Sequence, residues 1–360
     1  MSIMIHALST LKGLIKSKKL HIDHWAFRLH YRATVLILFL SCVLVSTKQY
    51  AGEPIKCSSG ITQESSLIDT YCFVTTTYIV KKALNLTPSE GAPHPGIYPS
   101  QNPEDFRQIT YYQWLVFILL IQAIFFYFPH WLWKMWEDGE ISSLLERDQK
   151  FLPKEEQVKV RDIIVEHLRC KWSKSSSYFG KYLVCELLCL ANLFGQIALL
   201  DAVFFNEYLY YGFEVLAYFN SSPGSMVSPF LRIFPKVTSC IYRYFGSSGK
   251  LESQSFLCVL AVNVINEKIF LLLWFWFVFL AFFTIFMLVF KVALFTISSF
   301  RISVLSYRFP STRRDDLQLV IETGNLSNFL FLYLLGENMN ESSFSEVMEY
   351  FSTVQRGKIN

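Results

Sequence analysis

The residues of this chain most able to do chemistry are its eight cysteines. Thiols form disulfides only in an oxidising compartment, so the side of a membrane on which each cysteine lies decides its chemistry. Cys57 and Cys72 belong to one polar segment, and Cys240 and Cys258 belong to another. The other four are interpreted as small packing residues: Cys42, Cys170, Cys185 and Cys189.

Motifs for catalysis or cofactor binding are missing from the sequence. It has no glycine-rich phosphate loop, no nucleophile elbow and no His-Glu-x-x-His pattern. No set of His, Cys, Asp or Glu has metal-ligand spacing, and His167 is interpreted as a packing residue. Basic residues of segment 134–181 are mixed with acidic ones, which argues against nucleic acid as a partner. We therefore predict no enzymatic activity, no metal and no other cofactor.

The composition is that of a membrane protein. Of the 360 residues, 52% are hydrophobic and only 17% are charged, whereas about a quarter of the residues of soluble domains are charged. A helix needs about 20 apolar residues to cross a bilayer. Four segments meet this requirement and are predicted to be spans: 29–50, 111–133, 182–205 and 269–296.

The second of these spans is the clearest. Residues 111–133 contain no Lys, Arg, Asp or Glu, and Tyr and Trp cluster at both ends, as they do at membrane interfaces. This pattern argues against a buried helix of a soluble protein. Pro129 lies near the end of the span, where it would bend or end the helix.

Basic residues predict the orientation. The chain up to Arg32, between the second and third spans, and from Lys291 onward holds 23 of the 33 Lys and Arg residues. By the positive-inside rule, segments 1–28, 134–181 and 297–360 are cytoplasmic, and so are both termini. No cleavable signal peptide is apparent, so we expect the first span to be a retained signal anchor.

This topology places segments 51–110 and 206–268 outside the cell. Each contains two cysteines, and four thiols on the oxidising side predict two disulfides with three possible pairings.

The cytoplasmic segments have helical periodicity, including two helices expected on either side of Gly336. Glu186 lies inside a span, and we expect it to reach water or to pair with Lys181 or Arg169. The predicted fold is an all-α membrane protein with disulfide-stapled outer loops and a helical cytoplasmic domain.

Several sequence blocks resemble the innexins, the invertebrate gap-junction proteins. Tyr111, Tyr112, Gln113 and Trp114 are similar to the family's signature at the start of the second span. Other blocks that resemble the family lie before and after this signature, in the family's order, along nearly the whole chain. Among them are Asp69-Thr70-Tyr71-Cys72, Phe234-Pro235-Lys236-Val237-Thr238 and Asn266-Glu267-Lys268-Ile269.

The resemblance implies a large-pore channel of the plasma membrane. Its subunits, identical or related and eight in the family, would form a ring in the lipid bilayer, and two rings on neighbouring cells would dock through their outer loops as a gap junction. It also implies disulfides Cys57–Cys258 and Cys72–Cys240. The N-terminal segment would line the pore mouth, with these residues: Ser2, Ile3, Met4, Ile5, His6 and Leu8.

The sequence departs from the innexin pattern at two places, and two other interpretations of the residues stay open. Residues 1–8 differ from the usual family start, which leaves conductance and gating open, and Ala261 replaces a frequent proline. Five apolar N-terminal residues approximate a helical stripe: Ile3, Ile5, Leu8, Leu11 and Ile15. From the residues alone, this stripe also fits a short interfacial helix without a pore role. A four-span adhesion protein is a second class, but the claudin and tetraspanin cysteine patterns are missing.

The choice between a docked channel and an undocked, pannexin-like hemichannel depends on glycosylation. Asn85 and Asn220 start outer-loop sequons, and a glycan there would hold two rings apart. Proline follows each sequon and favours an extended, stiff acceptor site. We expect weak or no modification and therefore rings that dock.

Overall fold

The computed structural model describes residues 22–58, 65–84, 86, 92, 94–100, 102–145, 154–172, 177–221 and 228–359. The chain divides into two compact units, each built from segments far apart in sequence. The sheet unit comprises residues 37–124 and 193–279, and the helical unit comprises residues 1–36, 125–192 and 280–360. The predicted pore segment, residues 1–8, lies outside the described residues.

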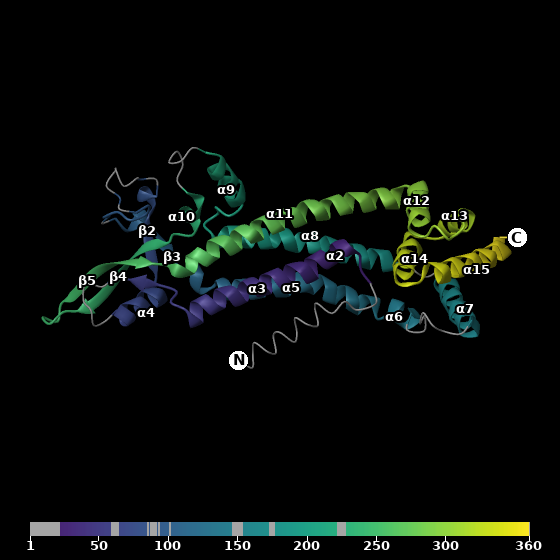
Figure 1. The fold of residues 1–360 in the computed structure, drawn as a ribbon, viewed down its shortest axis with the longest axis horizontal. Helices are drawn as coiled ribbons and strands as arrows, with labels where there is room; N and C mark the ends of the chain where they lie inside the picture. Colours follow the sequence, from purple (N-terminus) through teal and green to yellow (C-terminus); the bar gives the residue numbers. More distant parts are fainter. Residues whose placement is uncertain are drawn as a thin grey trace. The chain divides into compact units, whose positions relative to one another are not determined.

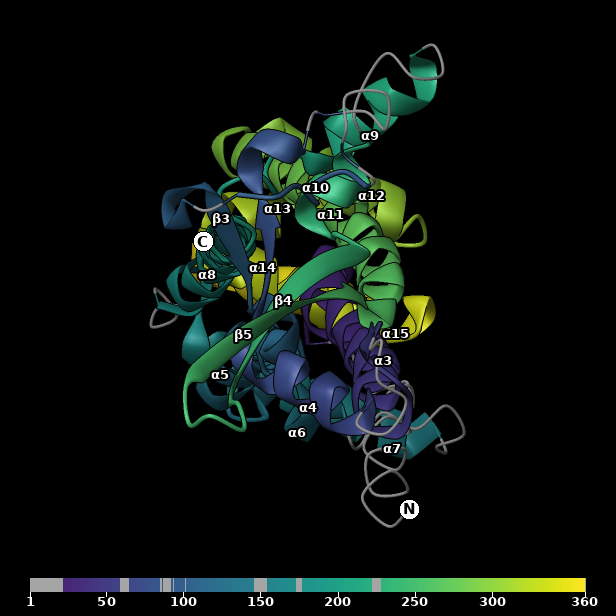
Figure 2. The same cartoon turned by 90° about the vertical axis from the view of Figure 1, so that its left-hand side faces the viewer.

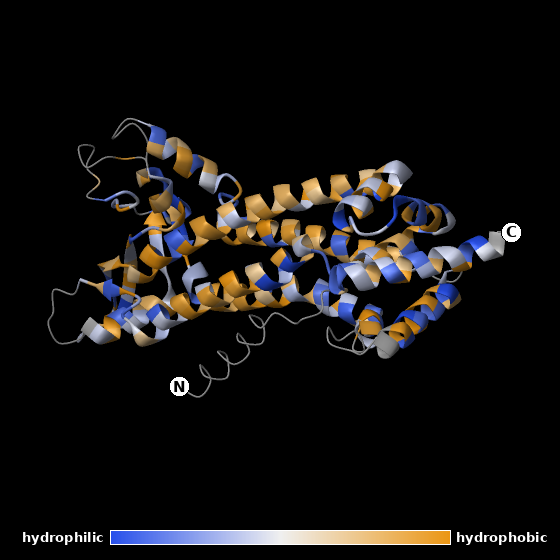
Figure 3. Ribbon diagram, turned by 45° about the vertical axis from the view of Figure 1, so that its right-hand side comes forward, coloured by the Kyte–Doolittle hydropathy of each residue, from blue (hydrophilic) through white to orange (hydrophobic). Residues whose placement is uncertain are grey.

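Four helices of the described chain are long and apolar enough to cross a membrane (Figures 1 and 3). The shortest has 23 residues, which at 1.5 Å per residue is about 35 Å, more than the thickness of a bilayer core. The four-span helical prediction is thus confirmed. The helices are Trp25–Ala51 (α2 Trp25–Arg28, η1 Leu29–Thr34, α3 Val35–Ser46 and η2 Thr47–Ala51), α5 Leu115–Glu137, α8 Ser177–Val203 and α11 Ala261–Thr296.

Pro129 does not end the second helix. α5 continues through Pro129 to Glu137, so of the two expected effects, a bend or a helix end, the helix end is excluded. Membrane helices tolerate an internal proline because neighbouring groups or local adjustments satisfy the backbone carbonyl that it leaves without a donor.

The sheet unit contains a five-stranded sheet that the sequence analysis did not predict. The strands are β1 Lys56–Cys57, β2 Thr77–Val80, β3 Phe106–Ile109, β4 Val237–Phe245 and β5 Leu251–Val259. Their order is β1-β5-β4-β2-β3, and every pairing is antiparallel. The prediction of an all-α protein therefore holds for the spans but not for the loops. Segments 51–110 and 206–268 each supply strands, so the sheet joins the two predicted loops.

A long hairpin of β4 and β5 dominates this sheet (Figure 2). Its register pairs Val237 with Val259 at the base and Phe245 with Leu251 beside the turn. Gly249 in the turn has a φ of +71°, a left-handed conformation that glycine adopts without strain. The sheet unit also contains short helices: α4 Ser65–Thr75, η3 Lys81–Ala83, η5 Pro103–Asp105, η6 Tyr111–Gln113, α9 Tyr211–Asn220 and α10 Pro229–Ile233.

The helical unit has a core of aromatic and aliphatic side chains, with Trp133, Phe344 and Phe351 fully buried. Its helices outside the spans are α6 Glu140–Leu145, α7 Lys154–Lys171, α12 Ser298–Arg308, α13 Arg314–Thr323, α14 Leu326–Asn338 and α15 Glu341–Ile359. The two helices expected around Gly336 are present as α14 and α15, but α14 continues to Asn338, so the break follows Gly336 by two residues. Gly336 lets the Phe309 ring approach, since a Cβ there would lie 2.4 Å from Cζ of Phe309.

Candidate functional site

Two disulfides join the two predicted outer segments within the sheet unit. Cys57 of β1 is bonded to Cys258 of β5, and Cys72 of α4 is bonded to Cys240 of β4. This is the pairing that the resemblance implies. Cys57 and Cys258 are direct partners in the β1–β5 register, and the Cys57 amide donates a hydrogen bond of 2.6 Å to Asp69. The sheet brings the cysteines together across sequence separations of 201 and 168 residues.

The disulfide sulfurs form one buried cluster. The Sγ atoms of Cys57, Cys72 and Cys258 lie within 4.8 Å of one another. Metal binding requires thiolates, and all three sulfurs are already in disulfide bonds. The cluster is therefore a covalent cross-link between the strands and α4.

The Tyr-Tyr-Gln-Trp signature forms a turn immediately before α5. The Tyr111 hydroxyl donates to the Ile233 carbonyl at 2.7 Å and accepts from the Asn263 side chain at 3.2 Å. Asn263 also donates to the Pro235 carbonyl at 2.8 Å. Burial raises the pKa of Tyr111 well above its usual value, so the hydroxyl keeps its proton as a donor. Tyr111 thus holds segment 206–268 to the start of α5.

The next two signature residues, Tyr112 and Gln113, contact the other predicted loop. The Gln113 side chain donates to the Phe73 carbonyl at 2.6 Å, and the Tyr112 hydroxyl donates to the same carbonyl at 3.4 Å. Tyr112 is buried, whereas the Trp114 side chain is 60% exposed. The structure therefore gives the buried part of the signature a positioning role and leaves Trp114 on the surface.

A network of ion pairs fixes the connection between α8 and β4. Glu207 pairs with Arg107 at 2.6 Å and with Arg232 at 3.1 Å, and Arg232 also pairs with Glu214 of α9. The hydrogen bond to Glu214 raises the pKa of Arg232. These charges belong to β3, α9, α10 and the chain between α8 and α9, so the network ties both predicted loops together.

The far end of the β4–β5 hairpin is apolar and exposed. Phe245 is 77% exposed, and Leu251, its partner in the register, is also exposed. Tyr244, the residue before Phe245, is also exposed, but it lies on the other face of the hairpin because successive side chains of a strand alternate between faces. An exposed cluster of large apolar side chains on a cross-linked hairpin is typical of a surface that binds another protein.

Known proteins similar to this chain were identified by sequence. A family model described as Innexin matches residues 23–354. Innexin shaking-B of Drosophila melanogaster is 34% identical over 96% of this chain and 94% of its own length. Innexin inx2 of Schistocerca americana is 33% identical over 99% of both chains.

The chain belongs to the innexin family. The prediction made from the Tyr111–Trp114 signature and its companion blocks is confirmed. Innexins are channel proteins of gap junctions and not enzymes, and family membership implies assembly with related subunits in a membrane.

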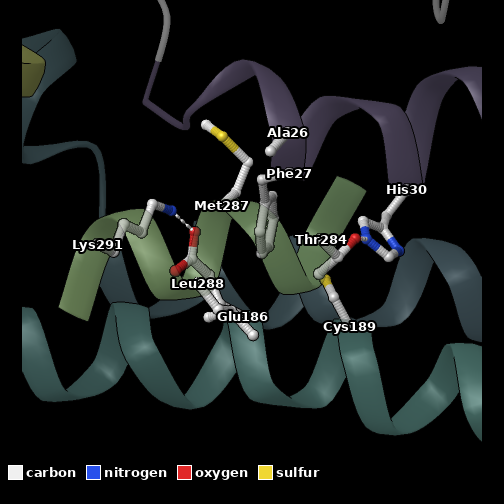
Figure 4. Close-up of a pocket in the computed structure, with 9 residues that line it drawn as sticks. All are labelled: Ala26, Phe27, His30, Glu186, Cys189, Thr284, Met287, Leu288 and Lys291. Carbon is white, nitrogen blue, oxygen red and sulfur yellow. Dashed lines mark hydrogen bonds and ion pairs between the residues drawn. The ribbon is translucent and has the colours of Figure 1, made fainter. Parts of the chain in front are cut away.

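A second group of polar residues lies inside the spans of this innexin, within the helical unit (Figure 4). The Glu186 carboxylate of α8 forms an ion pair with the Lys291 ammonium of α11, and both side chains are buried. The expected pairing with Lys181 or Arg169 is wrong. The sequence did contain a signal for the observed pair, because Glu186 lies in the predicted third span and Lys291 in the predicted fourth span. Charged residues inside a bilayer usually pair with each other.

Glu186 and Lys291 line a pocket between the helices, and His30 lines the same pocket (Figure 4). Its Nε2 atom lies 2.8 Å from Oγ1 of Thr284, and that hydroxyl donates its proton to the Leu280 carbonyl at 2.6 Å. Since the threonine proton is already used, His30 Nε2 is the donor of this bond. The contact links Trp25–Ala51 to α11 of this innexin.

The structure places only some of the other residues predicted to belong to functional sites. Asn220 ends α9 and is exposed, while Asn85 and the pore-segment residues lie outside the described part of the chain. Sequence reasoning missed Asn263, which binds Tyr111, and the Arg107, Glu207, Glu214 and Arg232 network. His167 pairs with Glu140 at 3.0 Å and lies against Phe331, as its interpretation as a packing residue requires.

Proposed function

We propose that this innexin is a subunit of a large-pore channel that passes ions and small metabolites between cells. The observation that carries the proposal is the sheet unit. Its two disulfides, Cys57–Cys258 and Cys72–Cys240, cross-link both predicted loops into one sheet whose hairpin ends in an exposed apolar cluster. Family membership supports the channel, and the rigid exposed cluster supports docking.

The finer parts of the proposal follow the family. Eight identical or related subunits would surround the pore, with residues 1–28 at its mouth and lipid around the ring. Segments 51–110 and 206–268 would face outward, and both termini would be cytoplasmic, as the basic residues favour. A second ring on the neighbouring plasma membrane would complete the gap junction. An undocked, pannexin-like hemichannel is the alternative, and no observation favours it.

Paired-cell recording tests this function. Cells without other innexins are transfected, and both the junctional conductance of cell pairs and the dye uptake of single cells are measured. We expect both signals. If the protein reaches the surface and neither signal appears, the channel proposal is wrong.

A substitution at the hairpin separates docking from conduction. Phe245→Asp places a charge in the exposed cluster, so junctional conductance should fall at least tenfold while dye uptake continues. Tyr307→Asp, on an exposed aromatic residue of α12, is the matched control and should preserve both signals. Unchanged junctional conductance in Phe245→Asp cells would exclude this cluster as the docking surface.

A further inference from the structure

Helix α9, Tyr211–Asn220, has a broad apolar face that no described residue covers. Leu209, Tyr210, Phe213, Leu216 and Phe219 are all exposed, and Phe219 is 69% exposed. At 100° per residue, these side chains and Ala217 occupy one half of the helix surface. Asn220, in the last helical position, is the only exposed polar residue between Tyr210 and Asn220. Such a face is unfavourable in water.

The start of α9 and the residues just before it are fixed to α11. The indole nitrogen of Trp274 donates to the Leu209 carbonyl at 3.1 Å, and the Tyr208 hydroxyl donates to the Phe270 carbonyl at 2.9 Å. Gly212 lies so close to the Trp274 ring that a Cβ would be 2.0 Å from Cε3. The first turn of α9 therefore has a defined position along α11.

That position lies within the apolar part of α11. Lys268 is exposed, and the 22 residues that follow it, 269–290, contain no charged side chain. Trp274 is six residues beyond Lys268, which corresponds to about 9 Å along the helix. Interfacial helices bury their apolar face by about 5–10 Å. The beginning of α9 is thus at the depth of a headgroup and acyl-chain boundary.

The exposed face of α9 continues onto the apolar surface of α11. The Phe213 ring packs 4.8 Å from the Trp274 ring, and the Trp274 ring packs 5.1 Å from the ring of Phe275. Phe275 and Leu272 are both exposed on this membrane-spanning helix. Figures 1 and 2 show α9 leaving the side of α11 instead of running along it.

The charge on α9 is kept away from this face. Glu214 is the only charged residue between Tyr210 and Ser221, and it pairs with Arg232 on α10. Tyrosine and phenylalanine provide most of the exposed surface, and amphipathic aromatic rings suit the membrane interface. Helix α9 therefore combines an exposed aromatic face, a Glu214 charge neutralised by Arg232, and a defined position along α11.

We propose that α9 is an interfacial membrane helix. It lays its aromatic face into the leaflet that the N-terminal end of α11 enters, and phospholipid covers Tyr210, Phe213, Leu216 and Phe219. A second copy of the chain is the competing occupant. Lipid is favoured because the face is continuous with a membrane-spanning surface and lies at the depth of the bilayer boundary.

Site-specific photocrosslinking distinguishes the two occupants. Benzoylphenylalanine replaces Phe219 or, in a second variant, Phe213 in the full chain, which is purified and placed in phosphatidylcholine nanodiscs. The control carries the same residue at Phe245 on the hairpin. After illumination, intact-mass and peptide mass spectrometry measure the fraction of each position bound to phosphatidylcholine.

We expect phosphatidylcholine adducts at positions 213 and 219 that exceed those at position 245 at least fivefold. Cross-linking to a second copy would overturn the proposal, and so would lipid adducts equal to those of the control. Gel filtration of each variant verifies that it has the size of the unmodified protein, and the second position provides the test if one variant does not fold. The result is independent of conduction, so it can fail without the channel function failing.

Discussion

Glu186 of α8 and Lys291 of α11 form a buried ion pair between two membrane-spanning helices. The carboxylate and the ammonium are each costly to bury alone, because apolar surroundings offer no other stabilisation of charge. Each therefore depends on the other. Since the third and fourth spans supply one partner each, the pair fixes how α8 and α11 pack in the helical unit.

Breaking this pair should destabilise the protein. Lys291→Met leaves the Glu186 carboxylate without its partner, at a cost of about 3–5 kcal/mol. The double variant Glu186→Gln, Lys291→Met removes both charges and should recover most of that loss. Thermal unfolding in detergent, followed by loss of the monodisperse species, measures both. A melting temperature equal to that of the unmodified protein in Lys291→Met would contradict the role of the pair.

The disulfides should be found in the same pairing in the purified protein. Peptide mapping without reduction is expected to recover Cys57 with Cys258 and Cys72 with Cys240. A peptide linking Cys57 to Cys72 would refute the pairing. Cys240→Ser should destabilise the sheet unit by about 2–5 kcal/mol and abolish junctional conductance. Cys170→Ser, on an exposed free cysteine of α7, is the control and should change neither.

The hydroxyl of Tyr111 should matter more than the surface tryptophan beside it. Tyr111→Phe leaves the Ile233 carbonyl and the Asn263 amide each without one hydrogen-bond partner, at a cost of about 1–3 kcal/mol. Trp114→Phe changes an exposed side chain and should cost less than about 0.5 kcal/mol. Differential scanning fluorimetry of the two variants tests the ranking. Equal shifts would show that the buried contacts of Tyr111 do not stabilise the fold.

Acid should weaken the helical unit through Glu140. Burial alone would raise its pKa, but the hydrogen bonds from His167 and Lys171 and the positive charges of these two side chains together outweigh burial and hold the pKa below its usual value. A carboxyl group with a lowered pKa contributes stability above its unfolded value of about 4.3, and this is lost as the pH falls through the folded value. Glu140→Gln should therefore remove part of the stability decrease between about pH 5 and pH 3. Identical pH profiles for the two proteins would contradict this.

Neither outer sequon should carry a glycan. Proline follows both sequons, and Asn220 ends the helix that we place at the membrane surface. Glycosidase treatment of protein from animal cells should leave its gel mobility unchanged, and Asn220→Gln should have the same mobility. A shift that disappears in Asn85→Gln, together with no current between paired cells, would favour the undocked hemichannel.

The spans were predictable from sequence because a bilayer requires only a local property, a run of about 20 apolar residues. Family membership was equally accessible, since Tyr111, Tyr112, Gln113 and Trp114 form one contiguous motif. The sheet was not accessible in this way. β5 begins Leu251-Glu252-Ser253-Gln254-Ser255, with no alternating apolar pattern, because its first five residues are exposed. It is held by β4 and by the disulfide from Cys258 to Cys57, which lies 201 residues away in the chain.

Only the tertiary structure decided which groups meet. The sequence determined that Glu186 lies in a span, but not that Lys291, 105 residues away, neutralises it. Likewise, Tyr210–Asn220 is a short apolar stretch whose sequence alone does not distinguish a core helix from a surface helix. In the structure Tyr211, Gly212 and Val215 are buried, and the face that carries Phe213, Leu216 and Phe219 remains exposed. Periodicity and composition record a residue's local preference, whereas its partner depends on how helices and strands pack in three dimensions.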